Sequence, residues 1–207
     1  MKTLNLDGIE ITHIHHAAVK IKTKDLVIYV DPYRVADEQA DLILITHDHP
    51  DHFDSGSILK LGKPSTKIIA PEILKEKIAG DVKTLKPGES DEILNVKIST
   101  IPSYNLSRPN HSKDKGYLGY VIEVLGKRIY VPGDTDKTPE MAALKNIDLA
   151  FLPIAGPMMD EEEASSAVKE FKPKIVVPYH YGEVIGRGDP EKFAGLVGDA
   201  AKVEILE

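Results

Sequence analysis

The 207-residue sequence contains no cysteine. This absence excludes disulfide bonds, thiolate metal sites and cysteine nucleophiles together. Any metal site in this protein must therefore be built from nitrogen and oxygen ligands, chiefly the side chains of histidine, aspartate and glutamate.

Long apolar segments are also missing. No apolar run approaches the length that spans a membrane, and the first ten residues carry Asp7 and Glu10 where a signal peptide needs an apolar stretch. We therefore expect a cytoplasmic protein without a membrane partner.

Positive charge is in deficit, because 26 Lys and Arg residues face 33 Asp and Glu residues and give a formal net charge of −7. Such a chain has no global attraction to nucleic acid, although a local basic patch remains open. We expect a small-molecule substrate and no nucleic-acid partner. The sequence leaves open whether copies of the chain form a homo-oligomer.

The composition is that of an ordinary globular protein, with 42% hydrophobic and 29% charged residues. The length suits one large domain with a real core, and no Gly/Ser linker, repeat or low-complexity tract divides the chain. We therefore expect a single domain over residues 1–207.

Short strand-like runs dominate the first half of the chain, and a second strand-rich stretch follows later. Strands are predicted over 4–6, 9–14, 17–22, 26–30, 41–46, 67–70, 96–101, 117–124, 128–131, 149–153 and 175–178. Helices are predicted over 55–61, over 71–79 with a proline in the first turn, and after the acidic residues 160–164, which suit a helix N-terminus. The pattern predicts an α/β domain with two strand-rich halves, each partly covered by helices.

The segment 46–52, T-H-D-H-P-D-H, places three of the eight histidines and two aspartates behind an apolar run. A solvated turn is one explanation, and a metal site is the other. On a strand, His47 and His49 point to the same side, roughly 6 to 7 Å apart, and could share one ion. Asp51 and His52, after a proline and at the start of a following helix, would face a neighbouring position, where a second ion needs further ligands.

Later residues extend this pattern. The motif H-D-H-P-D-H at 47–52, His111, G-D-T at 133–135 and His180 together resemble the metallo-β-lactamase superfamily. The segments 27–33, 126–136 and 174–182 look closer still to the ascorbate-6-phosphate lactonase-like branch of small hydrolases, and the resemblance spans roughly residues 9 to 190.

The resemblance implies a four-layer αββα sandwich of the metallo-β-lactamase type with a two-metal site at one edge. His47, His49 and His111 would then hold the first ion, Asp51, His52 and His180 would hold the second, and Asp134 would bridge them.

Other polar residues near these motifs have competing interpretations. In H-I-H-H at 13–16, we favour His16 as a residue beside the site, and His13 and His15 as plain surface or core histidines. Strand alternation would place His16 on the opposite face from the other two. Asp31 could orient a ligand imidazole through its second ring nitrogen, or could simply cap a turn before a proline. Asp48 should point away from the two ligand histidines.

The ligand set suits zinc, with manganese or iron as alternatives. Between two such ions a bridging water becomes hydroxide near neutral pH and attacks an ester, lactone or phosphoester. Asp134 would bridge the ions, while Asp51 would orient the hydroxide and later carry a proton to the leaving group. A non-catalytic metal-binding or regulatory module is the alternative, but an intact ligand set argues against it.

The stretch 104–115 predicts the charge of the substrate. It carries Arg108, Lys113 and Lys115 around His111 in an otherwise acidic chain. Arg108, with donors from Tyr104 and Asn105, could bind a phosphate or carboxylate of the substrate. An ordinary solvated basic loop is the competing explanation.

Overall fold

The computed structural model describes residues 2–106, 109–182, 184 and 186–206. The chain divides into two compact units. Unit 1 comprises Met1–Lys86 with Leu206–Glu207, and unit 2 comprises Pro87–Ile205. The single domain expected over residues 1–207 stays a prediction.

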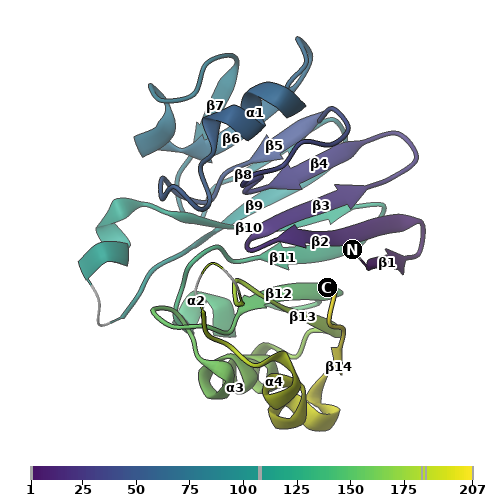
Figure 1. The fold of residues 1–207 in the computed structure, drawn as a ribbon, viewed down its shortest axis with the longest axis vertical. Helices are drawn as coiled ribbons and strands as arrows, with labels where there is room; N and C mark the ends of the chain where they lie inside the picture. Colours follow the sequence, from purple (N-terminus) through teal and green to yellow (C-terminus); the bar gives the residue numbers. More distant parts are fainter. Residues whose placement is uncertain (1, 107–108, 183, 185, 207) are drawn as a thin grey trace. The chain divides into compact units, whose positions relative to one another are not determined.

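Unit 1 is built on a seven-stranded mixed sheet in the order β1-β2-β3-β4-β5-β6-β7 (Figure 1). The strands are β1 (Thr3–Leu6), β2 (Ile9–His15), β3 (Ala18–Lys22), β4 (Val27–Val30), β5 (Leu42–Leu44), β6 (Lys67–Pro71) and β7 (Val82–Leu85). Strands β1 to β4 pair antiparallel, whereas β4 to β7 pair parallel. The short β5 is fully buried, as expected for a central parallel strand.

Helix α1 (Ser55–Leu61) connects β5 to β6, as parallel pairing requires a crossover. The side chain of Asp54 caps its first turn by accepting from the backbone N–H groups of Gly56 and Ser57. Ile58 and Leu61 are buried in a cluster with residues of β4, β5 and β6. The helix predicted over 55–61 is therefore confirmed.

The helix predicted over 71–79 is wrong. Pro71 ends β6. One 3₁₀ turn, η1 (Glu72–Leu74), and a hydrogen-bonded turn at 75–77 follow before bends lead into β7. The physical reason is the length of the connection. Residues 72–81 must leave the sheet, return along β6 and enter β7 in parallel register, and parallel crossovers need about a dozen residues when they contain a helix.

Unit 2 contains a second seven-stranded mixed sheet, in the order β14-β13-β12-β11-β10-β9-β8. The strands are β8 (Ser90–Ile93), β9 (Val96–Pro102), β10 (Leu118–Val124), β11 (Lys127–Val131), β12 (Leu149–Pro153), β13 (Ile175–Tyr179) and β14 (Lys202–Val203). Strands β8 to β11 pair antiparallel and β11 to β14 parallel. Strands β7, β8 and β14 are absent from the sequence prediction because they are short and partly exposed.

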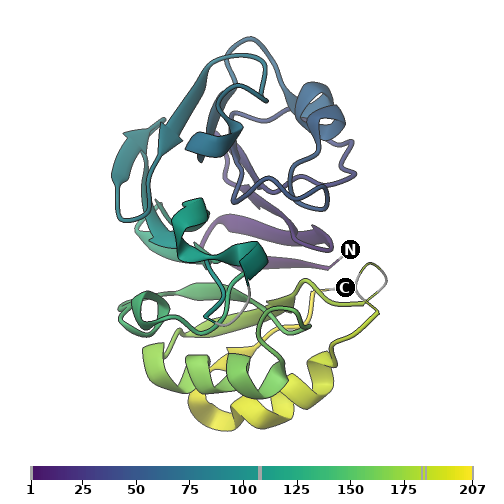
Figure 2. The same ribbon diagram turned by 90° about the vertical axis from the view of Figure 1, so that its left-hand side faces the viewer.

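The helices of unit 2 are α2 (Pro139–Ala142), α3 (Glu161–Phe171) and α4 (Pro190–Val197), with 3₁₀ turns η2 (Pro109–His111), η3 (Lys113–Lys115) and η4 (Gly198–Ala200). Helices α3 and α4 lie side by side, in green and yellow in Figure 2. Asp160 caps α3 ahead of its acidic first turn, as predicted.

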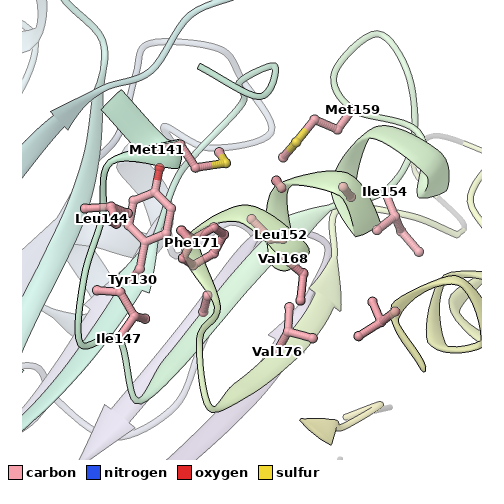
Figure 3. Close-up of a cluster of buried hydrophobic side chains, with 14 of the residues drawn as sticks. Tyr130, Met141, Leu144, Ile147, Leu152, Ile154, Met159, Val168, Phe171 and Val176 are labelled. Carbon is pink, nitrogen blue, oxygen red and sulfur yellow. The ribbon is translucent and has the colours of Figure 1, made fainter. Parts of the chain in front are cut away.

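A large apolar cluster anchors these helices to the sheet of unit 2 (Figure 3). The rings of Tyr130 on β11 and Phe171 on α3 meet edge to face, with centroids 6.2 Å apart. Val168 of α3 is buried in the same cluster as Val176 of β13.

Among the described residues, no helix combines the length and the apolar character needed to cross a membrane.

Two glycines allow the chain to turn after β11. A Cβ at Gly119 of β10 would lie 2.8 Å from the carbonyl oxygen of Pro132, so only glycine permits this close approach. Gly133 has a φ of 67°, in the left-handed region. Asp134 directly follows Gly133, so the turn at Gly133 sets the position of the Asp134 backbone and, with it, of the side chain.

Candidate metal centre

The first group of candidate ligands lies in unit 1, just beyond β5. Strand β5 ends at Leu44, so His47 and His49 lie in the turn that follows it. The expectation that they continue a regular strand is therefore wrong. Their ring centroids are nevertheless only 4.7 Å apart, and the rings of His47 and His52 are 4.1 Å apart. Backbone N–H groups of His52 and Phe53 both donate to the carbonyl of His49, at 3.0 and 2.8 Å, and close the turn.

Asp51 and His52 belong to the same turn, not to the start of a helix. The helix begins only at Ser55 because Asp54, not an earlier residue, provides the cap. His47 and His52 are buried, whereas His49 and Asp51 are half-buried.

Asp31 orients this turn from the end of β4. It is fully buried and has a φ of 45°. Its carboxylate accepts hydrogen bonds from the backbone N–H of Thr46 at 2.7 Å, the hydroxyl of Thr46 at 2.6 Å and Nδ1 of His52 at 2.7 Å. Because Nδ1 of His52 carries the donated proton, Nε2 keeps the lone pair that a metal needs. The assigned tautomer follows from the hydrogen-bond pattern.

Thr46 fixes the ring of His47 in a similar way. Its single hydroxyl proton is donated to Asp31, so its oxygen accepts from Nδ1 of His47, 2.9 Å away. Nε2 of His47 is then the nitrogen with a lone pair. One atom each of Asp31, His47 and His52 lie within 4.8 Å of one another. Sequence reasoning missed Thr46, although its place directly before His47 was a usable signal.

The histidines at 13–16 separate into different roles. Nε2 of His16 donates to a carboxylate oxygen of Asp51 at 3.0 Å, and the His16 side chain is fully buried. Nε2 of His13 donates to the backbone carbonyl of His16 at 2.7 Å. The ring of His15 instead stacks on Tyr33, with centroids 5.8 Å apart. A register shift between His13 and His15 interrupts the strand alternation that the sequence predicted.

Asp48, between the two ligand candidates His47 and His49, makes an ion pair of 2.8 Å with Lys77. This contact agrees with the expectation that Asp48 points away from the two histidines.

The second group of candidate ligands lies in unit 2. Asp134 follows β11, His180 follows β13 directly, and His111 ends the 3₁₀ turn η2. The two oxygens of the Asp134 carboxylate face different imidazoles. Oδ1 lies 3.1 Å from Nε2 of His180, and Oδ2 lies 3.9 Å from Nε2 of His111. All three residues are buried.

Hydrogen bonds from neighbouring residues hold the backbone of this second group. The hydroxyl of Ser103 donates to the carbonyl of Asp134 at 2.9 Å, and that of Tyr179 donates to the carbonyl of Gly133 at 3.2 Å. The backbone N–H of Asn105 donates to the carbonyl of His111 at 2.7 Å. Sequence reasoning did not single out Ser103, which directly follows β9, or Tyr179, which ends β13, because both are distant from Asp134 in the sequence.

The donor chemistry of both groups fits a divalent metal. Each unit gathers buried imidazoles around a buried or half-buried carboxylate, within the short distances described above. Nitrogen and oxygen donors of this kind suit borderline ions such as zinc. An imidazole whose other nitrogen donates to a carboxylate, as in His52, is the usual form of a metal-binding histidine.

Two of the predicted substrate-binding residues, Tyr104 and Asn105, lie near the second group. The hydroxyl of Tyr104 donates to Glu140 at 2.9 Å, and the side-chain amide of Asn105 donates to Asp136 at 2.6 Å. Burial, reinforced by the hydrogen bond to Glu140, raises the pKa of Tyr104. Arg108 lies outside the described residues. Contact between these three residues and a substrate stays a prediction.

Comparison with known proteins places this chain among metal-dependent hydrolases. The model of the β-lactamase superfamily domain matches residues 10–180. The UPF0173 metal-dependent hydrolase of Thermococcus onnurineus is 35% identical, and that of Pyrococcus abyssi is 33% identical, each with 96% of both chains covered.

Solved structures agree. A candidate metal-dependent hydrolase from Parabacteroides distasonis is 34% identical, with a TM-score of 0.88 and coverage of 99% of this chain and 97% of that one. A metallo hydrolase from Ignicoccus hospitalis is 26% identical, with a TM-score of 0.80 and coverage of 96% and 95%. The α/β fold of the metallo-β-lactamase type and the resemblance to that superfamily are thus confirmed. The chain belongs to the UPF0173 family of metal-dependent hydrolases, within the β-lactamase superfamily.

Proposed function

We propose that this protein hydrolyses a small ester, lactone or phosphoester with the help of two divalent metal ions. The proposed ligands of the first ion are His47, His49 and His111, those of the second are Asp51, His52 and His180, and Asp134 is shared by both. The observation that carries the proposal is the Asp134 carboxylate. One of its oxygens faces His111, a proposed ligand of the first ion, and the other faces His180, a proposed ligand of the second. A carboxylate that bridges two ions must present one oxygen to each of them.

When bound, two such ions lower the pKa of the water that they share and polarise the oxygen of the bond to be broken. The chain supplies the orientation. Asp31 and Thr46 fix the ring nitrogens of His52 and His47, so that Nε2 of each ring is the donor atom. Zinc is the ion that the donor set suits best, and manganese or iron are the alternatives.

Asp51 is the proposed proton carrier. Its Oδ2 accepts a hydrogen bond of 3.0 Å from the buried His16, which holds the carboxylate in one orientation. In the proposed reaction Asp51 positions the attacking water and afterwards passes a proton to the leaving group. His16 is thus proposed as a residue that positions Asp51.

We further propose a small anionic substrate, a cytoplasmic location and no nucleic-acid partner. The acidic net charge of −7 supports the last point, because nucleic-acid binding depends on positive charge. The basic residues at 104–115 support an anionic group on the substrate. The ascorbate-6-phosphate lactonase-like branch of the superfamily is the model for such a substrate.

The test combines metal analysis of the purified protein with hydrolysis of bis-p-nitrophenyl phosphate, lactones and thioesters. His49→Ala and Asp134→Ala should each lower turnover by orders of magnitude while the fold is kept, because each opens a coordination position. Asp48→Asn is the matched control from the same motif, since Asp48 pairs with Lys77, and it should keep wild-type turnover. Near-wild-type turnover in Asp134→Ala, or less than one ion per chain without hydrolysis after reconstitution, would contradict the proposal.

A further inference from the structure

Two segments of unit 2 are hydrogen-bonded to each other beside the second group of candidate ligands. Residues 103–106 follow β9, and residues 134–136 begin two residues after the end of β11. The backbone N–H of Asp136 donates to the carbonyl of Tyr104 at 3.0 Å. The fully buried hydroxyl of Thr135 accepts from the backbone N–H of Tyr104 at 3.2 Å. The backbones of the two segments are therefore held together.

Asp136 adds side-chain hydrogen bonds to this contact. Its Oδ1 accepts from the side-chain amide of Asn105 at 2.6 Å, and its Oδ2 accepts from the backbone N–H of Leu106 at 2.8 Å. Asp136 is half-buried, and Asn105 is only 5% exposed. Hydrogen bonds to an ionised carboxylate are stronger than neutral ones, and here both oxygens are engaged. The carboxylate thus fixes residues 105 and 106 against the segment that carries Asp134.

Asn105 connects this contact to His111. The backbone N–H of Asn105 donates to the carbonyl of His111 at 2.7 Å. His111 ends the single 3₁₀ turn η2, so no regular strand or long helix fixes its backbone. Its Nε2 lies 3.9 Å from Oδ2 of Asp134. Because a metal site needs its ligands held to within roughly 0.5 Å, a displacement of Asn105 is enough to spoil the spacing of His111 and Asp134.

A second contact holds the other side of His111 more weakly. The ammonium group of Lys113 pairs with Glu140 at 2.6 Å and lies 4.9 Å from the centre of the Tyr104 ring. The Lys113 side chain is 60% exposed, and exposed ion pairs contribute little to stability. The buried contact through Asp136 and Asn105 is therefore the one that determines the position of His111.

We propose that Asp136 is a positioning residue of the metal centre. Its carboxylate accepts two hydrogen bonds from residues 105 and 106, and through Asn105 it sets the place of His111 relative to Asp134. The inference rests on the proposed function, because it takes His111 and Asp134 as metal ligands. It adds a residue that acts on these ligands through Asn105.

The first experiment measures zinc affinity of the full chain by competition with a chromophoric chelator. Asp136→Ala removes both acceptor oxygens and should lower the affinity by roughly tenfold or more, as for other residues behind metal ligands. Asp136→Asn should restore most of the lost affinity. Its amide oxygen can accept from Leu106, and the Asn105 amide can turn so that its oxygen accepts from the new N–H₂ group.

Asp148→Ala is the matched control, because Asp148 also accepts from one backbone N–H and one side chain of unit 2. It should lose stability in urea unfolding and keep the wild-type zinc affinity. Wild-type affinity in Asp136→Ala would overturn the inference. Equal losses of affinity in the two alanine variants, or in Asp136→Ala and Asp136→Asn, would overturn it as well. Asp136→Ser takes the place of Asp136→Ala if the alanine variant does not fold.

The second experiment needs no metal. The Cε1–Hε1 signals of the histidines are recorded by NMR for the metal-free full chain. In Asp136→Ala the His111 signal should shift, whereas the His52 signal should stay in place because Asp31 holds that ring. A wild-type protein that binds no zinc would remove the proposed function, and the His111 signal would then decide the positioning role alone. An unchanged His111 signal in Asp136→Ala would overturn the inference in either case.

Discussion

Replacing Asp31 by asparagine tests whether this buried carboxylate sets the metal-binding form of the neighbouring imidazole. Asparagine keeps the size of the side chain and tolerates the left-handed backbone, here with a φ of 45°. It exchanges one acceptor oxygen for an N–H₂ donor. The wild-type carboxylate accepts at both oxygens, from the backbone of Thr46 at Oδ1 and from the hydroxyl of Thr46 and from His52 at Oδ2.

The expected loss of stability follows from these hydrogen bonds. If the N–H₂ group faces the backbone N–H of Thr46, two donors meet and one hydrogen bond is lost. If it faces His52, it either meets the Nδ1–H or moves the His52 proton to Nε2, the nitrogen that a metal needs. Hydrogen bonds to a charged group contribute about 1.5 to 3 kcal/mol each, and a buried unsatisfied donor costs about 1 to 3 kcal/mol. We expect Asp31→Asn to lower the free energy of unfolding by roughly 2 to 4 kcal/mol. We expect zinc affinity to fall by roughly 10- to 100-fold, as for other carboxylates behind a metal-binding histidine.

Urea unfolding of the metal-free protein measures the first quantity, and competition with a chromophoric chelator measures zinc affinity. Asp148→Asn is the control, because Asp148 is a buried carboxylate of unit 2 that accepts from the backbone of Arg128 and from Lys174 but contacts no imidazole among its described hydrogen bonds. It should lose stability while its zinc affinity stays at the wild-type value. An Asp31→Asn variant that binds zinc like the wild type would refute the role of Asp31 in fixing the His52 tautomer.

Two further predictions concern acid stability and ligand identity. Burial alone would raise the pKa of Asp148, but hydrogen bonds from Lys174 and the backbone of Arg128 outweigh it and hold that pKa below its usual 3.8. Because the folded pKa is depressed, the contribution of Asp148 is present above pH 3.8 and is lost as the pH falls through the folded pKa, so wild type and Asp148→Asn should converge in urea stability in acid. A stability gap that stays constant down to about pH 2 would contradict this linkage. His15→Gln should keep full zinc content in metal analysis, because the His15 ring stacks on Tyr33, and zinc loss would show that His15 is a ligand.

Much of the fold could be predicted from local patterns. The apolar runs of β2 to β6 and β9 to β13 lie where the sequence placed them, because alternating or fully apolar stretches have few other ways to be buried. Local propensity failed at 71–79, where a good helical pattern yielded a single 3₁₀ turn. There the length of the crossover between two parallel strands, a property of the sheet, overrode the preference of the segment.

The sequence by itself determined the chemistry of the candidate centre. The absence of cysteine limited the donors to nitrogen and oxygen, and the spacing within 47–52 was local enough to bring His47, His49 and His52 together in one turn. The sequence offered Asp31 and His16 as candidates beside these rings, but only the tertiary structure decided which side chain each of them binds. Asp31 reaches His52 across 21 residues, and His16 reaches Asp51 across 35, through hydrogen bonds that no local pattern encodes. The sequence also did not predict the apolar cavity of about 490 Å³ beside α1. Its walls come from separate segments that meet only when the sheet of unit 1 has formed.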